Sequence, residues 1–225
     1  MGFLIQLRVL LWKDLLSELR GKELISMMAF FGLLVLVIFN FAFEPGSAEA
    51  AHLGSGILWV AFTFAGVLGL NRSFLLEKES EGLQGLLLSP VDRGVLYLGK
   101  LGGNFLFMLL VEALILPFFA LFFNLDLWLL LPQLALVAIL STLGFTAVGT
   151  LFAAMSAQAK SRELLLPTLL LPIVVPVIVA AVKSTGQILE GRPLAEVAQW
   201  LKLLLAFDLL YLVVSFLIFE YVVEE

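Results

Sequence analysis

The side chains that could do chemistry in this sequence are few, and two of the acidic ones lie inside long apolar runs. These are Glu112 and Asp208. His52 is the only histidine, and the chain has no cysteine, which excludes disulfide, iron–sulfur and thiolate–metal sites. A neutral imidazole can ligate haem iron, so His52 is a candidate haem contact. The other interpretation is an ordinary solvated histidine, and no metal site is predicted.

Glu112 and Asp208 need a physical explanation because an ionisable group inside a membrane costs a few kcal/mol and seldom faces lipid. One interpretation is that they line a central cavity or act on a passing substrate. The other is that they are hydrogen-bonded where helices meet, with Asn104 or Gln133 as partners. We favour the interface interpretation.

The elements that position these residues are membrane spans. The chain has 225 residues, of which 62% are hydrophobic and 14% are charged. Soluble domains are about half apolar and a quarter charged, so a soluble enzyme and a nucleic-acid-binding protein are both excluded. We expect one transmembrane domain over 1–225, an all-α membrane protein with six transmembrane helices. The expected spans are Leu24–Phe43, Leu53–Leu70, Leu101–Phe123, Trp128–Ala154, Leu164–Val182 and Leu201–Tyr221.

The basic residues predict the orientation of these spans. Ten of the 13 Lys and Arg residues lie before span one, between spans two and three, or after span four. The other side has only Lys183, Arg192 and Lys202. By the positive-inside rule both termini are expected in the cytoplasm.

Residues 1–22 form a predicted amphipathic helix at the membrane surface. A narrow polar stripe contains Lys13 and Arg20, and leucines occupy the opposite side. Such a helix lies in the headgroup layer with its basic side chains toward lipid phosphates.

The segment 71–100 is the longest polar stretch between spans. On a helix, Leu83, Leu86 and Leu87 share one face, and Ser89 and Pro90 are typical of the first residues of a new helix. The leucine face needs a cover, either the bilayer surface or another protein. On the other side of the membrane, Pro193 and the apolar residues that follow it predict a separate, re-entrant helix within 183–200.

Small residues and prolines mark the packing of individual spans. Span four repeats a small residue at every fourth position from Ala138 to Ala154, which favours close helix contacts. Span five contains Pro167, Pro172 and Pro176, and each removes a helical hydrogen bond, so this helix should bend.

This order of elements resembles the membrane subunit of ABC-2 type transporters. Within that group, the length and the stretch LEKESEGLQGLLLSPVDRGVLYLGK are similar to the CcmB family, the haem exporter protein B of cytochrome c maturation. The resemblance covers essentially the whole chain and implies an ABC-2 permease fold. It implies that the coupling helix at 77–90 docks on a separate ATP-binding subunit. The residues of that helix would be Glu77, Glu79, Glu81, Gly82, Leu83, Leu86, Leu87, Leu88, Ser89 and Pro90.

The partners that the resemblance implies are a CcmA-like ATPase, a second copy of this chain, CcmC- and CcmD-like membrane proteins and, indirectly, a CcmE-like haem chaperone. Membrane lipids are partners too, and nucleic acid is not. No cofactor is expected on this chain, ATP would lie on the partner subunit, and haem would belong to the complex. The sequence contains no G-x-x-x-x-G-K-[ST] phosphate loop, so we expect a non-catalytic subunit. The alternatives are an ABC-2 permease that exports a lipid, polysaccharide or drug, and a membrane scaffold without transport.

Overall fold

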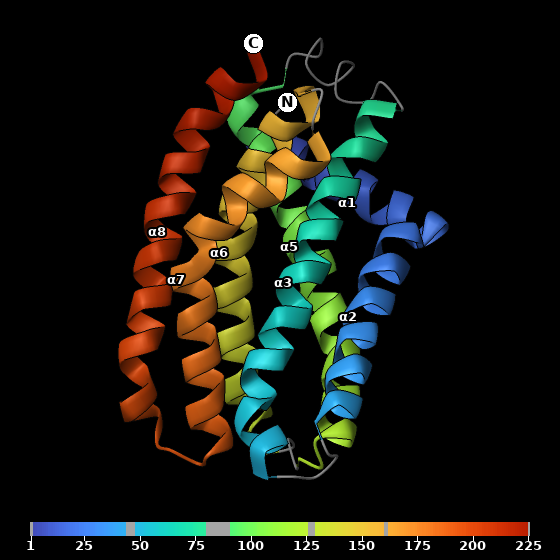
Figure 1. Cartoon of the computed structure of the whole chain (residues 1–225). Coiled ribbons are helices and arrows are strands. Elements are labelled where there is room, and N and C mark those ends of the chain that lie inside the picture. The colour runs from blue at the N-terminus through green and yellow to red at the C-terminus, as the bar shows by residue number, and fades with distance from the viewer. Residues whose placement is uncertain (1, 44–47, 80–90, 126–128, 160–161, 225) are drawn as a thin grey trace.

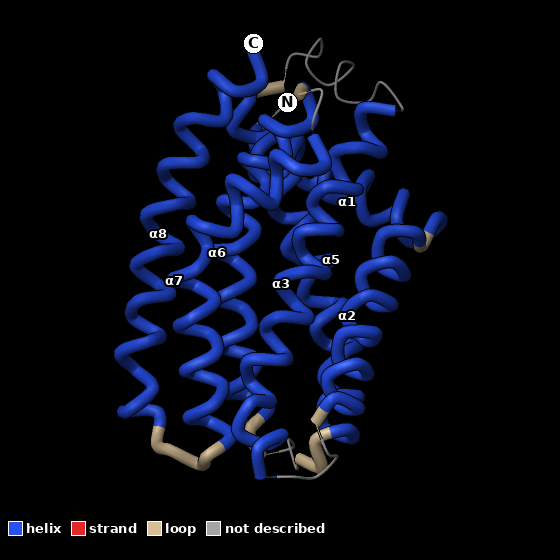
Figure 2. Tube along the Cα trace, in the orientation of Figure 1, coloured by secondary structure: helices blue, strands red, loops and turns tan. Residues whose placement is uncertain are grey.

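The described structure is entirely helical. The computed structural model describes residues 2–43, 48–79, 91–125, 129–159 and 162–224, and within these ranges it contains helices and loops but no strand (Figure 2). The helices are α1 (Phe3–Gly21), α2 (Glu23–Ala42), α3 (Ala48–Glu79), α5 (Arg93–Phe122), α6 (Leu131–Gln158), α7 (Arg162–Leu189) and α8 (Leu194–Glu224).

Six of these helices are long and apolar enough to cross a membrane. The candidate spans are Glu23–Ala42, Leu53–Leu75, Arg93–Phe122, Leu131–Ala157, Leu164–Leu189 and Leu194–Val223. At a rise of about 1.5 Å per residue, the shortest of them covers the roughly 30 Å of a bilayer core. The predicted all-helical fold with six spans is therefore confirmed.

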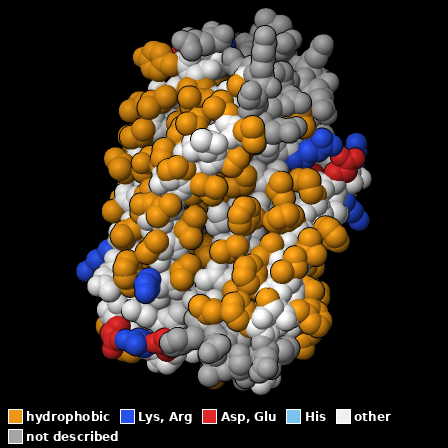
Figure 3. All heavy atoms as spheres, in the orientation of Figure 1, with side chains coloured by type: hydrophobic (Ala, Val, Ile, Leu, Met, Phe, Trp, Pro, Cys, Tyr) orange, Lys and Arg blue, Asp and Glu red, His pale blue; other side chains and the backbone are white. Residues whose placement is uncertain are grey.

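The spans pack as a bundle with α3 and α6 inside it. In both helices 72% of the most apolar window is buried, against 33% or less in the other four spans. Figure 1 shows α1 crossing the bundle near one end, and both termini lie at that end. On the face that Figure 3 shows, apolar side chains cover most of the described surface between groups of charged side chains. This distribution is what a bilayer requires of a protein surface.

The start of α5 differs from the prediction that Ser89 caps a helix beginning at Pro90. The N-cap is Asp92, whose carboxylate accepts a hydrogen bond from the Gly94 amide at 2.7 Å, and α5 begins at Arg93. Both Ser and Asp are good N-cap residues, and here the later one caps the helix. Residues 80–90 lie outside the described residues.

The separate external helix expected within 183–200 is not present. α7 continues to Leu189, a turn of four residues follows, and α8 begins at Leu194. The turn contains Gly191 at φ 74° and Pro193. A glycine in the left-handed region ends one helix and a proline opens the next, so the apolar residues after Pro193 belong to the span itself.

The three prolines of α7 lie inside one unbroken helix. Figure 1 shows that α7 changes direction along its length, with an oblique part nearer the termini. The predicted bend is therefore present.

Candidate functional site

Polar side chains of α5 face α6 and bind it at three levels. The Tyr97 hydroxyl donates to the Ala147 carbonyl at 3.1 Å. Asn104 Nδ2 donates to Thr150 Oγ1 at 3.1 Å. Thr142 Oγ1 donates to Glu112 Oε1 at 2.7 Å. These side chains are buried, so each bond forms away from water and holds the two helices in one register.

Glu112 is therefore an interface residue, and its predicted hydrogen-bonding to a neighbouring helix is confirmed. Its partner is Thr142, and not Asn104 or Gln133, because Asn104 bonds to Thr150 about two turns nearer the termini. The second oxygen, Oε2, is buried and has no hydrogen-bond partner in the described part of the chain. Within the described chain, this oxygen of the carboxyl group therefore remains available to bind another molecule.

Asp208 lies on the other side of the same turn of α6. Its carboxylate contacts the backbone of α6 at Gly144, where a Cβ would collide with Asp208 Oδ1 and lie 3.0 Å from Phe207. Asp208 is 1% exposed, and neither carboxylate oxygen has a hydrogen-bond partner among the described residues. The two intramembrane carboxyl groups thus flank residues 141–144 of α6 from α5 and α8.

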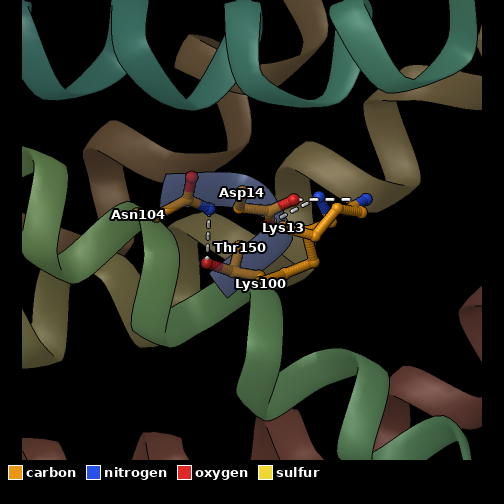
Figure 4. A network of polar contacts seen from close by, with 5 residues as sticks. All are labelled: Lys13, Asp14, Lys100, Asn104 and Thr150. Atoms are coloured by element: carbon orange, nitrogen blue, oxygen red, sulfur yellow. Dashed lines mark hydrogen bonds and ion pairs between the residues drawn. The ribbon is translucent and has the colours of Figure 1, made fainter. Parts of the chain in front are cut away.

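A buried ion pair joins α1 to α5 near the end that holds the termini. Lys100 Nζ lies 2.9 Å from Asp14 Oδ2, and Lys13 Nζ lies 3.2 Å from Asp14 Oδ1. Figure 4 shows this pair beside the Asn104–Thr150 hydrogen bond, so contacts from α1, α5 and α6 meet in one place.

Glycines of α5 allow α1 to approach closely at this ion pair. Leu10 packs against Gly99, and Leu11 packs against Gly102, where a Cβ would lie 2.7 Å from a Leu11 methyl group. Close packing and the ion pair therefore hold α1 against α5, in addition to its composition as a membrane-surface helix. This pair was not predicted from the sequence, although Asp14 in an apolar, basic helix and Lys100 next to a span were both visible signals.

α5 and α6 also line a groove of about 970 Å³ that lies between Glu112 and the loop joining the two helices. Its walls are apolar except for Glu112 and Asn124. Exposed side chains along both helices, among them Pro117, Leu121 and Ile139, show that it opens on the outer surface of the bundle.

Several predicted site residues lie outside the described side chains. The coupling-helix residues Glu81–Pro90 lie outside the described ranges, and Glu77 and Glu79 are described only as the backbone of the last turn of α3. The same holds for His52, which lies in the first turns of α3 at the end away from the termini. Among the described residues, no cluster of three His, Cys, Asp or Glu could hold a metal.

The fold and these contacts define a class of protein: a six-span helical membrane protein without metal-ligand clusters in its described part. The sequence profile described as CcmB protein matches residues 5–224. The chain belongs to the CcmB family.

Characterised relatives cover most of the chain. Heme exporter protein B of Pseudomonas aeruginosa is 32% identical over 190 residues, which is 84% of each chain. Heme exporter protein B of Rhodobacter capsulatus is 30% identical over 200 residues, 85% of this chain and 89% of the relative. The protein of the same name from Bradyrhizobium diazoefficiens is 29% identical over 187 residues.

Proposed function

We propose that this chain is the membrane subunit of an ABC-type complex in which a separate ATPase drives haem handling during cytochrome c maturation. The observation that carries the proposal is the similarity to relatives named Heme exporter protein B along more than four-fifths of their length. Six spans and the absence of a phosphate loop in the sequence fit a subunit whose energy comes from a partner.

The contacts of α5 suggest how ATPase movement would reach the spans. α3 ends at Glu79 and α5 begins at Arg93, so residues 80–92 join them at the end that holds the termini. The first turns of α5 bind α1 through Lys100 and α6 through Tyr97. A push on the connecting segment would therefore move α5 together with α1 and strain its bonds to α6.

The family resemblance supports a proposal for the remaining partners. The ATPase would be CcmA-like, the membrane subunit would form a dimer, and CcmC- and CcmD-like proteins would lie beside it in the bacterial inner membrane. A CcmE-like chaperone would receive the haem. Haem would be held by the complex, with His52 as a candidate contact, and this chain would be non-catalytic.

The docking step is tested by the double substitution Leu86→Asp/Leu87→Asp. Two carboxylates on the leucine face should prevent binding in an apolar cleft, so the ATPase should no longer co-purify while the chain still inserts in the membrane. Leu129→Asp is the matched control, because Leu129 is 87% exposed and lies in the loop at the other end of the bundle. Unchanged co-purification of the double variant would contradict the proposed docking.

The haem step is tested in cells by deleting the gene and measuring covalently bound haem in c-type cytochromes. We expect loss of holocytochrome and recovery with the wild-type gene but not with the Leu86→Asp/Leu87→Asp variant. Normal holocytochrome after deletion would instead favour a permease for a lipid, polysaccharide or drug, or a scaffold.

A further inference from the structure

The groove between α5 and α6 has a carboxyl group at its deep end. Glu112 lines the groove together with Ala113 and Pro117. Glu112 Oε2 is buried and has no hydrogen-bond partner in the described part of the chain. An unpartnered carboxyl oxygen therefore lies at the wall of an apolar groove.

The groove has the length of about one leaflet of the membrane. The two polar residues of the groove are Glu112, in α5, and Asn124, in the turn that follows α5. They are twelve positions apart, which corresponds to about 18 Å at 1.5 Å per residue. A bilayer core of about 30 Å places Glu112 near its middle when Asn124 lies near the surface. The groove thus leads from one membrane face to a carboxyl group at mid-depth.

The groove has a volume of about 970 Å³, which suits a small molecule. Pockets that hold drug-sized ligands have volumes of roughly 300–1,000 Å³ and mostly apolar walls with a few polar groups.

The carboxyl group selects the chemistry of the ligand. A hydrocarbon chain would leave Glu112 Oε2 without a hydrogen-bond partner, which is unfavourable for a buried polar group. An amine on an apolar body pairs with the carboxyl group in either protonation state, because an ammonium group donates to a carboxylate and a neutral amine accepts from a carboxylic acid.

We propose that the groove between α5 and α6 is a binding site for lipophilic amines, with the ammonium or amino group at Glu112 and the apolar body along α5 and α6. This site is independent of the proposed haem function, because nothing in it requires nucleotide, haem or a second subunit. A binding measurement alone therefore tests the proposed site.

The test is binding of rhodamine 6G, a fluorescent apolar cation with N–H donors, to the protein in phosphatidylcholine nanodiscs without nucleotide. Saturable binding is expected, with about tenfold weaker affinity in Glu112→Gln, which loses the carboxyl group but keeps the side-chain size. Ala135→Phe, which fills the groove while leaving Glu112 in place, should also abolish binding. The matched control is Ala206→Phe, which adds the same ring to an exposed position of α8 and should bind like wild type. Affinity unchanged in both groove variants would overturn the proposal.

A second measurement does not depend on substituting Glu112. The native chain has no cysteine, so Ala135→Cys introduces a single thiol in the groove and Ala206→Cys a single thiol on α8. Rhodamine 6G should slow maleimide modification of Ala135→Cys only, in nanodiscs and in the complex purified from membranes. Equal protection at both positions would overturn the proposal, as would a groove thiol that is already unreactive in the complex because another subunit fills the groove.

Discussion

The Lys100 ammonium and the Asp14 carboxylate form an ion pair inside the protein. Lys100 is 5% exposed, and its nitrogen lies 2.9 Å from the Asp14 carboxylate. Removing one member of such a pair leaves the other charge without its main counter-ion, and that is more costly than losing the attraction itself. The pair also explains why α1 is fixed at this point of α5, where glycines leave room for its leucines.

Asp14→Asn should therefore destabilise the protein by roughly 2–3 kcal/mol. Lys13→Ala is the matched control, since Lys13 is 46% exposed and also pairs with Asp14. Exposed pairs contribute at most about 1 kcal/mol. Thermal unfolding of the purified protein, followed by fluorescence-detected size exclusion in detergent, measures both. Equal losses in the two variants would show that burial of Lys100 has no special cost.

At the scale of single residues, the sequence predicts which polar side chains are buried but not which residues they contact. Glu112 and Asp208 were expected to be buried in the bundle, and they are. That Glu112 binds Thr142, and that Asp208 faces Gly144, depends on how α5, α6 and α8 are rotated against each other. Hydropathy cannot give these rotations, because the spans are apolar on most of their sides.

Close packing between spans depends on glycines that face a neighbouring helix. At Gly144 of α6, a methyl group would collide with Asp208 and press on Phe207 of α8. At Gly56 of α3, no atom beyond its chain neighbours and the nearby backbone of its own helix lies within 4 Å of the position a Cβ would take. The two glycines have the same helical backbone and opposite surroundings, which makes them a matched pair.

Gly144→Ala should destabilise the protein by about 1–3 kcal/mol, because overpacking forces α6 and α8 apart. Gly56→Ala should be neutral or stabilising by up to about 1 kcal/mol, because alanine is the better helix former. The difference between their unfolding midpoints checks the α6–α8 interface directly. A Gly144→Ala protein as stable as Gly56→Ala would mean that the α6–α8 contact is wrong.

The corner between α1 and α2 depends on one residue with an unusual backbone. Lys22 has φ 57° and ψ 12° and is the only residue between the two helices. Beside it, Glu18 Oε1 accepts a hydrogen bond from the Ile25 amide at 2.9 Å, which satisfies a donor in the first turn of α2. The left-handed region is strongly disfavoured for β-branched residues and tolerated by asparagine.

Lys22→Asn should keep the stability of the protein or raise it slightly, and Lys22→Val should lower it by about 1–2 kcal/mol. Both substitutions remove the same positive charge, so a difference between them reports only the backbone. Unfolding midpoints measure the effect, and identical midpoints would contradict the sharp corner.

At the scale of elements, the sequence predicts spans well and their ends poorly. Each of the six apolar runs became a helix because lipid offers no partner to an unbonded backbone group. The ends depend on local chemistry that several residues satisfy equally. Asp92 caps α5 instead of Ser89, and Gly191 with Pro193 makes a tight turn where a separate helix was expected.

At the scale of the whole molecule, both termini, the last turn of α3 and the first turn of α5 lie at one end of the bundle. The sequence places ten of its 13 basic residues in the segments that belong to this end. Lys183 and Lys202 are exposed on α7 and α8 nearer the other end, where long side chains reach the membrane surface with their charge. The charge bias therefore predicts that the end with the termini is cytoplasmic, which the proposed docking of an ATPase requires.

Single cysteines test this orientation, since the native chain has none. In spheroplasts, a membrane-impermeant maleimide should label Leu129→Cys and Glu190→Cys, which are exposed at the end away from the termini. Ser17→Cys, exposed on α1, should be labelled only after lysis. The opposite pattern would place residues 80–90 outside the cell, away from ATP and from any ATPase, and the proposed coupling would then be physically excluded.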